Sequence, residues 1–146
     1  MRILALDLGE KRIGVAASDE LLLTAQGLCV LASKGTVKDL GQVADLIRNQ
    51  AVSTVVLGLP RNMDGSIGPM AEKVREFGRL LQEQHPDVPV EYWDERLTTA
   101  GAQRMLIGAD MSRLKRRQVV DKVAAVLILQ GYLDHRANRR NASSEG

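Results

Sequence analysis

The residues MRILALDLGEKRIGVAASD at the start of the chain constrain the fold more than any other stretch. Residues 3–8 are apolar except for Asp7, and a run that is apolar on both faces is typical of a central strand. GEKR follows as a tight turn, after which apolar residues alternate with small ones at Ile13, Val15 and Ala17. We therefore predict a central strand over 2–8 with a second strand paired antiparallel to it.

The remaining chain alternates between the periodicities of helices and strands. We predict further strands over 22–31, 54–60 and 88–93. Between and after them we predict helices from Thr36, from Ile67 to the residue before Pro86, and over 98–107 and 118–134. Thr36 and Asp39 have the spacing of a capping box. Three consecutive strands followed by βαβ units predict an α/β fold: a five-stranded mixed sheet, its first three strands antiparallel, flanked by helices.

Length and linker composition predict a single domain. The chain has 146 residues and contains no internal repeat and no linker that would divide it. We predict one domain over 1–138, followed by a flexible tail over 139–146. Within the domain, residues 108–117 are predicted to form a mobile connection to the last helix.

Composition narrows the functional class. Aromatic residues make up 3% of the chain, which counts against a protein that stacks bases on aromatic side chains. Cys29 is the only cysteine, so no disulfide can form within the chain and a cytoplasmic location is expected. No apolar stretch approaches the length of a membrane span, so no membrane partner is expected. The net charge of +2 does not by itself indicate a polyanionic partner.

Acidic residues occupy three places where apolar residues would be expected. Asp7 lies near the end of the first predicted strand, Asp94 and Glu95 end the fifth, and Asp121 lies on the apolar face of the last helix. Burial of several carboxylates together is costly unless a cation neutralises them. Mg²⁺ and Mn²⁺ bind sites made largely of carboxylates and water. The three places therefore indicate a divalent-metal site.

Each acid taken alone also has an ordinary structural explanation. Asp7 could begin a turn with Gly9, Glu95 could form a surface ion pair, and Asp121 could lie in the first turn of a helix. A shared site is favoured because two of the acids end strands that a βαβ crossover can bring side by side, and a helix carrying the third can cover them. The spacing leaves open whether Asp94 or Glu95 faces that site, because neighbouring residues of a strand point to opposite faces.

Four segments together resemble the YqgF/RuvX family: DLGEKRIGVAASD, GLPRNMDGSIGP, DERLTT and VDKVAAVLILQGYLD. The resemblance extends over about residues 2–134. Members of this family are bacterial nucleases of the ribonuclease H-like superfamily, related to Holliday-junction resolvases. The resemblance therefore implies a ribonuclease H-like fold and a nuclease that uses one or two Mg²⁺ or Mn²⁺ ions. It also implies an acidic triad for catalysis and metal binding, which in this sequence is Asp7, Glu95 and Asp121.

Basic and polar residues near the predicted acids are candidates for contacts with nucleic acid. Gly9 lets the turn after Asp7 bend sharply and leaves room for a phosphate. SRLKRR immediately precedes the helix of Asp121, and cations beside a metal site suit a polyanionic substrate. The candidate nucleic-acid-binding residues are Gly9, Lys11, Arg12, Arg61, Asn62, Arg96, Arg104, Arg113, Lys115, Arg116 and Arg117.

Three functions remain after the resemblance is taken into account. The leading one is metal-dependent hydrolysis of phosphodiester bonds in 5′-end maturation of precursor 16S ribosomal RNA, with ribosome precursor particles as partners. The second is a structure-selective DNA nuclease, which would need a homodimer to cut two strands symmetrically. The resolvases, however, carry a further acid in the last helix, three residues after the first, where this chain has Ala124. The third is a nucleic-acid-binding factor in transcription or ribosome biogenesis that does not depend on cleavage.

Overall fold

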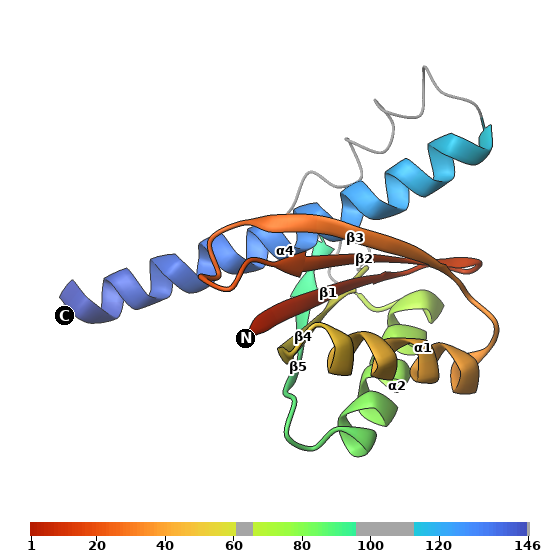
Figure 1. Ribbon diagram of the computed structural model, residues 1–146, viewed down its shortest axis with the longest axis horizontal. Helices are drawn as coiled ribbons and strands as arrows, with labels where there is room; N and C mark the ends of the chain where they lie inside the picture. Colours follow the sequence, from red (N-terminus) through yellow and green to blue (C-terminus); the bar gives the residue numbers. More distant parts are fainter. Residues whose placement is uncertain (61–65, 96–112, 146) are drawn as a thin grey trace.

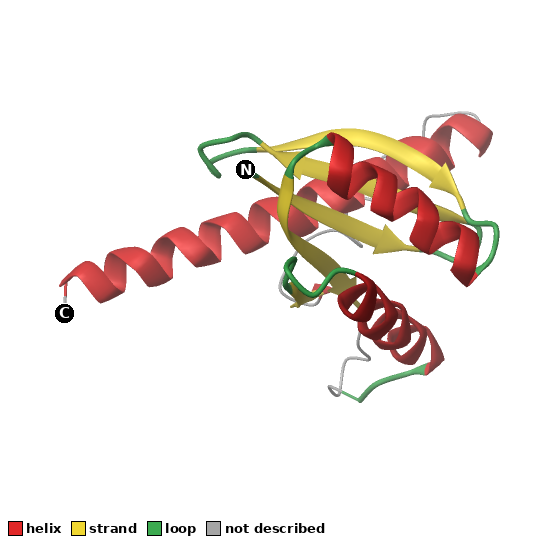
Figure 2. Ribbon diagram, turned by 60° about the horizontal axis from the view of Figure 1, so that its bottom comes forward, coloured by secondary structure: helices red, strands yellow, loops and turns green. Residues whose placement is uncertain are grey.

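The computed structural model describes residues 1–60, 66–95 and 113–145, with side-chain detail for all of these except 113–122 and 140–145. A five-stranded sheet forms the middle layer, and helices cover both of its faces (Figures 1 and 2). The strands are β1 (Arg2–Leu8), β2 (Arg12–Ser18), β3 (Ala25–Ala32), β4 (Val52–Leu59) and β5 (Val90–Asp94), and the helices are α1 (Thr36–Asn49), α2 (Pro69–Gln84) and α4 (Arg113–Glu145).

The strand order β3-β2-β1-β4-β5 places the first strand in the centre of the sheet. β1 pairs antiparallel with β2 and β2 pairs antiparallel with β3, whereas β4 is parallel to both β1 and β5. The predicted mixed sheet and its antiparallel first half are therefore confirmed. The physical reason is that short turns join antiparallel neighbours, whereas α1 and α2 are crossovers long enough to connect parallel strands.

Several element ends differ from the prediction by a few residues. β3 begins at Ala25 rather than at residue 22, because the Asp19 carboxylate accepts hydrogen bonds from the backbone N–H groups of Leu23 (2.7 Å) and Thr24 (3.0 Å) and holds the preceding residues in a turn. α2 begins at Pro69 rather than at Ile67, and proline is favoured at the first helical position because it has no N–H to leave unbonded. The helix predicted over 98–107 lies outside the described residues.

The start of α1 differs in kind from the predicted capping box. The first helical hydrogen bond runs from the Asp39 N–H to the Gly35 carbonyl (2.9 Å), so Gly35 is the capping residue, with a φ of 101° that favours glycine. Thr36 is already helical and makes no capping bond. Asp39 instead accepts hydrogen bonds from Ser33 Oγ (2.6 Å) and the Lys34 N–H (2.8 Å), so this buried carboxylate holds the incoming loop against the helix.

α4 is longer at both ends than the predicted helix over 118–134. It starts at Arg113, inside the segment predicted as a mobile connection, and continues through Glu145, within the predicted tail over 139–146. The extension has a local reason, since 113–117 are good helix formers and no proline or glycine occurs from 132 to 145. The domain boundary at residue 138 stays a prediction, although α4 crosses it. None of the described helices combines the length and apolar character needed to span a bilayer.

Side-chain alternation in the sheet creates two separate apolar cores. Leu4 and Leu6 of β1 pack with α1 and α2 on one face, whereas Ile3 and Ala5 pack with α4 on the other. The α4 core is completed by Ala16, Val56, Trp93, Ala125, Ile128, Leu129 and Leu133. The alternation of β1 then places Asp7 on the α4 face of the sheet, two residues beyond Ala5.

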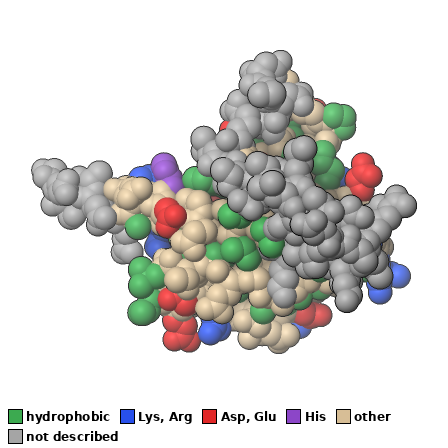
Figure 3. Space-filling view, turned by 90° about the horizontal axis from the view of Figure 1, so that it is seen from above, with side chains coloured by type: hydrophobic (Ala, Val, Ile, Leu, Met, Phe, Trp, Pro, Cys, Tyr) green, Lys and Arg blue, Asp and Glu red, His purple; other side chains and the backbone are tan. Residues whose placement is uncertain are grey.

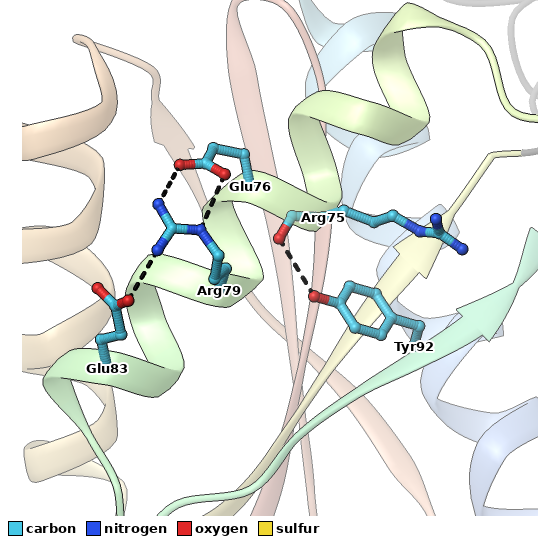
Figure 4. A network of polar contacts seen from close by, with 5 residues as sticks. All are labelled: Arg75, Glu76, Arg79, Glu83 and Tyr92. Carbon is cyan, nitrogen blue, oxygen red and sulfur yellow. Dashed lines mark hydrogen bonds and ion pairs between the residues drawn. The ribbon is translucent and has the colours of Figure 1, made fainter.

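Tyr92 attaches α2 to β5 (Figure 4). Its hydroxyl donates a hydrogen bond to the Arg75 carbonyl (3.3 Å) and lies so close to α2 that a Cβ atom on Gly78 would be 2.3 Å from it. On the exposed side of the same helix, Arg79 forms ion pairs with Glu76 and Glu83, which contribute little to stability because they are solvated. Glycine at position 78 therefore permits the close contact between α2 and β5.

Polar contacts fix α4 against both edges of the sheet. Gln130 accepts a hydrogen bond from the Ala25 N–H (3.0 Å) and donates one to the Leu23 carbonyl (3.2 Å). At the other edge, Tyr132 donates a hydrogen bond to Glu91 and packs edge-on against Trp93, with ring centroids 6.4 Å apart. Burial, together with the Glu91 carboxylate, raises the pKa of Tyr132 to about 12. These contacts determine how α4 lies across the sheet.

Candidate active site

Asp7 lies at the carboxyl end of the central strand, on the face covered by α4. It is only 8% exposed, and it pairs across the sheet with Gly14 of β2. On its other side, the register of Leu6 with Leu57 places Asp7 next to Gly58 of β4. Both neighbours are glycines, so no side chain from β2 or β4 stands directly beside the Asp7 carboxylate on this face.

Glu95 follows the last residue of β5 and reaches over β4 on the α4 face. Its Oε1 atom is buried and lies 3.0 Å from where a Cβ atom of Gly58 would be. The same Cβ position is 2.5 Å from Cδ1 of Ile128 on α4, which identifies the face. The Asp7 and Glu95 carboxylates therefore lie on one face of the sheet, at the carboxyl ends of β1 and β5, with Gly58 between them.

Asp94 lies on the opposite face. It is in register with Leu59, which belongs to the core formed with α1 and α2, and it follows Trp93, which belongs to the α4 core. Neighbouring residues of a strand point to opposite faces, so Asp94 is directed away from Asp7. The geometry thus distinguishes the two adjacent acids, which the sequence spacing alone did not.

Asp121 lies in α4, seven residues before Ile128. Seven residues are about two helical turns, so the helix backbone puts position 121 on the same side as Ile128 and about 10 Å nearer the start of α4. The Asp121 side chain lies outside the described residues. Two members of the predicted triad, Asp7 and Glu95, have described side chains. Among the residues with described side chains, no three His, Cys, Asp or Glu form a group that could hold a metal ion.

The predicted nucleic-acid-binding residues are partly described. Gly9 makes the turn after β1 tight: its N–H donates to the Arg12 carbonyl (2.8 Å), and a Cβ atom there would be 2.9 Å from that oxygen. Lys11 is exposed in this turn, and Arg12, the first residue of β2, is half-buried. Arg61, Asn62, Arg96 and Arg104 lie outside the described residues.

The four basic residues of the SRLKRR segment belong to the first turns of α4. Arg113, Lys115, Arg116 and Arg117 are helical in backbone, and their side chains lie outside the described set. The start of α4 lies above the same end of the sheet as the turn that joins β1 and β2 (Figure 1). Seen from the α4 side, acidic and basic side chains are interspersed over the described surface (Figure 3).

Gly58 lies beside Glu95 in the candidate site and was not among the residues predicted from the sequence. The signal was present, because a glycine interrupts the apolar strand TVVLGLP and an isolated glycine in a strand often marks a close approach of another group. Its partners, Glu95 and Ile128, are far away in the sequence. Only the folded structure shows which groups approach it.

The two described acids suit a hard divalent cation. Both contribute carboxylate oxygens, and Asp7 is buried as a residue and Glu95 at its Oε1 atom. Gly58 contributes no side chain of its own between them. Mg²⁺ and Mn²⁺ prefer oxygen ligands of this kind. The donor set is therefore compatible with the metal that the sequence predicts.

The fold is ribonuclease H-like, as comparison with solved structures shows. The Thermus thermophilus RuvC structure in complex with a Holliday junction substrate aligns with a TM-score of 0.60 at 11% identity, covering 92% of this chain and 96% of that chain. The fowlpox virus Holliday junction resolvase aligns with a TM-score of 0.56 at 17% identity, covering 92% and 99%. These identities are low, so the likeness concerns the fold.

Sequence similarity defines the family within this fold. Residues 1–135 match the RuvX family, described as Holliday junction resolvase. A Heliobacterium modesticaldum protein named as a candidate pre-16S rRNA nuclease is 52% identical, covering 94% of this chain and 92% of that protein. A Moorella thermoacetica protein of the same name is 54% identical, covering 92% and 95%. The chain therefore belongs to the RuvX family, a family of nucleases.

Proposed function

We propose that this protein is a metal-dependent nuclease that hydrolyses phosphodiester bonds in 5′-end maturation of precursor 16S ribosomal RNA. The observation that supports the chemistry best is the placement of the Asp7 and Glu95 carboxylates on one face of the sheet, on either side of Gly58. The substrate is suggested by the names of relatives that are about half identical over nearly the whole chain. Action on a ribosomal precursor would place the protein in the cytoplasm.

Asp7, Glu95 and Asp121 would hold the metal in this proposal. Mg²⁺ or Mn²⁺, when bound, polarises a phosphoryl oxygen and lowers the pKa of a coordinated water. The chain's own contribution is to fix the carboxylates before substrate arrives. Asp7 is held within the central strand, and the buried Oε1 atom of Glu95 lies beside Gly58. Such positioning reduces the reorganisation needed when charge develops on the phosphate.

The basic residues at the same end of the molecule would hold the phosphates of the substrate. Lys11 and Arg12 follow Asp7 directly, and Arg113, Lys115, Arg116 and Arg117 begin the helix that carries Asp121. Contacts of lysine and arginine with phosphates position a nucleic acid without reading its sequence. This arrangement suits a nuclease whose substrate is guided into place mainly by charge.

Replacement of Arg113, Lys115, Arg116 and Arg117 by alanine should weaken substrate binding and flatten its dependence on salt. Each lost phosphate contact lowers the slope of log affinity against log salt by roughly one unit, so the slope should fall by up to about four. The measurement is fluorescence anisotropy with labelled RNA over a range of KCl concentrations. Replacement of the exposed Lys38 on α1 is the control, and an unchanged slope in the fourfold variant would show that the substrate does not touch the start of α4.

The proposed activity can be tested by incubating purified protein with matched RNA and DNA substrates, including a fragment spanning the 5′ end of 16S RNA and a four-way DNA junction. We expect cleavage of the RNA fragment that requires Mg²⁺ or Mn²⁺ and stops on addition of EDTA. Cleavage of the DNA junction alone would favour the second candidate function. Cleavage of neither substrate would contradict the proposal.

The second candidate, structure-selective cleavage of DNA, is favoured by the description of the family as Holliday junction resolvase. One residue makes cleavage by the resolvase mechanism less favourable. Ala124, at the place where resolvases carry a further acid, is completely buried in α4, where a carboxylate would have to be desolvated. Symmetric cutting would also require two copies of the chain, so a strictly monomeric protein in solution would count against this candidate.

A further inference from the structure

Gly58 lies where three parts of the proposed active site meet. It is in β4, between β1, which contains Asp7, and β5, which Glu95 follows, and it is in register with Trp93. A Cβ atom at this position would lie 2.5 Å from Cδ1 of Ile128 and 3.0 Å from Oε1 of Glu95. Both distances are shorter than a Cβ atom normally has to its neighbours. Any side chain at position 58 would therefore displace the side chain of Ile128, that of Glu95, or both.

A glycine in this strand is otherwise unfavourable. Val55 and Val56 occupy buried positions of β4, as expected for a strand covered on both faces, whereas glycine weakens a strand because it is flexible and contributes no packing. The φ of Gly58 is not among the positive values of the described glycines, so the backbone itself does not demand glycine. The close approach of Glu95 and Ile128 therefore explains why this position is glycine.

We infer that Gly58 is a positioning residue for the metal site. The missing side chain lets the Glu95 carboxylate lie over β4, towards Asp7, and lets α4 approach the strand ends closely enough to bring position 121 near them. This inference rests on the proposed function, because it supposes that these acids hold the metal. Gly58 itself touches neither metal nor substrate and acts only through Glu95 and α4.

The test separates the two contacts of Gly58. Gly58→Ala should displace both Ile128 and Glu95, whereas Ile128→Val removes the Cδ1 atom and so relieves the shorter contact. In the double variant Gly58→Ala/Ile128→Val the fold should therefore recover, while the contact with Glu95 remains. We expect the melting temperature of this double variant to be close to that of Ile128→Val. Its Mn²⁺ affinity should nevertheless be about 10- to 100-fold lower than that of Ile128→Val, the range seen when the partners that orient metal ligands are altered.

Mn²⁺ affinity is measured without nucleic acid, by isothermal titration calorimetry on the purified chain, so the readout does not depend on cleavage. Gly78→Ala is the matched control. Its new Cβ atom would also meet close neighbours, Tyr92 Oη at 2.3 Å and Leu57 Cδ1 at 2.9 Å, but on the face of the sheet away from the acids. This control should lose thermal stability and keep the Mn²⁺ affinity of the wild type.

The outcomes distinguish this inference from the proposed function. If Asp7→Asn binds Mn²⁺ as tightly as the wild type, the acids do not hold the metal and the proposed function fails. If Asp7→Asn loses Mn²⁺ but the folded double variant binds it like Ile128→Val, the metal site stands and the role assigned to Gly58 is overturned. Equal losses of Mn²⁺ affinity in Gly58→Ala and Gly78→Ala would also overturn it, because general destabilisation would then explain both.

Discussion

Asp7→Asn is expected to cleave substrate at least about a thousandfold more slowly than the wild type at saturating Mg²⁺ or Mn²⁺. Metal assistance contributes several kcal/mol to stabilisation of the transition state, and about 4 kcal/mol corresponds to a factor of a thousand in rate. Asparagine has almost the same shape as aspartate, and it removes a negative charge from a buried position on the face shared with Glu95. The melting temperature in metal-free buffer should therefore not fall. Initial cleavage rates and melting curves provide the measurement.

Asp94→Asn is the matched control for this substitution. It makes the same chemical change next to Glu95, on the face of the sheet directed away from Asp7. Asp94→Asn should cleave at a rate close to that of the wild type, whereas Glu95→Gln should cleave much more slowly. Full activity in Asp7→Asn, in a preparation free of contaminating nuclease, would refute the proposed mechanism and would favour a nucleic-acid-binding factor that does not cleave.

Leu129→Ala is expected to lower the free energy of unfolding by about 2–5 kcal/mol, the range for removing a buried leucine side chain from a core. Leu129 is completely buried between α4 and the sheet, together with Ala125 and Ile128. For a chain of this size the loss corresponds to a fall in melting temperature of roughly 5–20 °C. Urea unfolding followed by circular dichroism measures the effect. The midpoint should shift to lower urea, while the slope of the free energy of unfolding against urea concentration stays unchanged.

Leu21→Ala deletes the same atoms from a leucine that is 76% exposed in the turn between β2 and β3. Its effect on the free energy of unfolding should stay within about 0.5 kcal/mol, as for most surface substitutions. A loss below about 1 kcal/mol in Leu129→Ala would mean that α4 does not pack on the sheet as described. It would also remove the basis for placing position 121 near the strand ends.

The order of elements and the layout of the sheet could be predicted from local patterns. The apolar run before Leu8 indicated a central strand because it is apolar on both faces, and β1 is central. The crossovers through α1 and α2 then dictated parallel pairing. The start of α1 at Thr36 was predicted correctly, but the capping contacts there were not, because Asp39 bonds to Ser33 and Lys34 instead of completing a capping box. The ends of α4 were predicted less well, since the helix extends beyond 118–134 in both directions.

The candidate acids could be identified from the sequence: one in the central strand, a pair at the end of β5 and one in the last helix, all within segments that resemble one nuclease family. That Glu95, and not Asp94, shares the face of Asp7 follows only from the fold, because it depends on the register of β5 with β4 and on which core Leu59 and Trp93 join. The fold also gives the reason for glycine at position 58. The contact joins residues 58, 95 and 128, and no local pattern can report a contact among groups that only folding brings together.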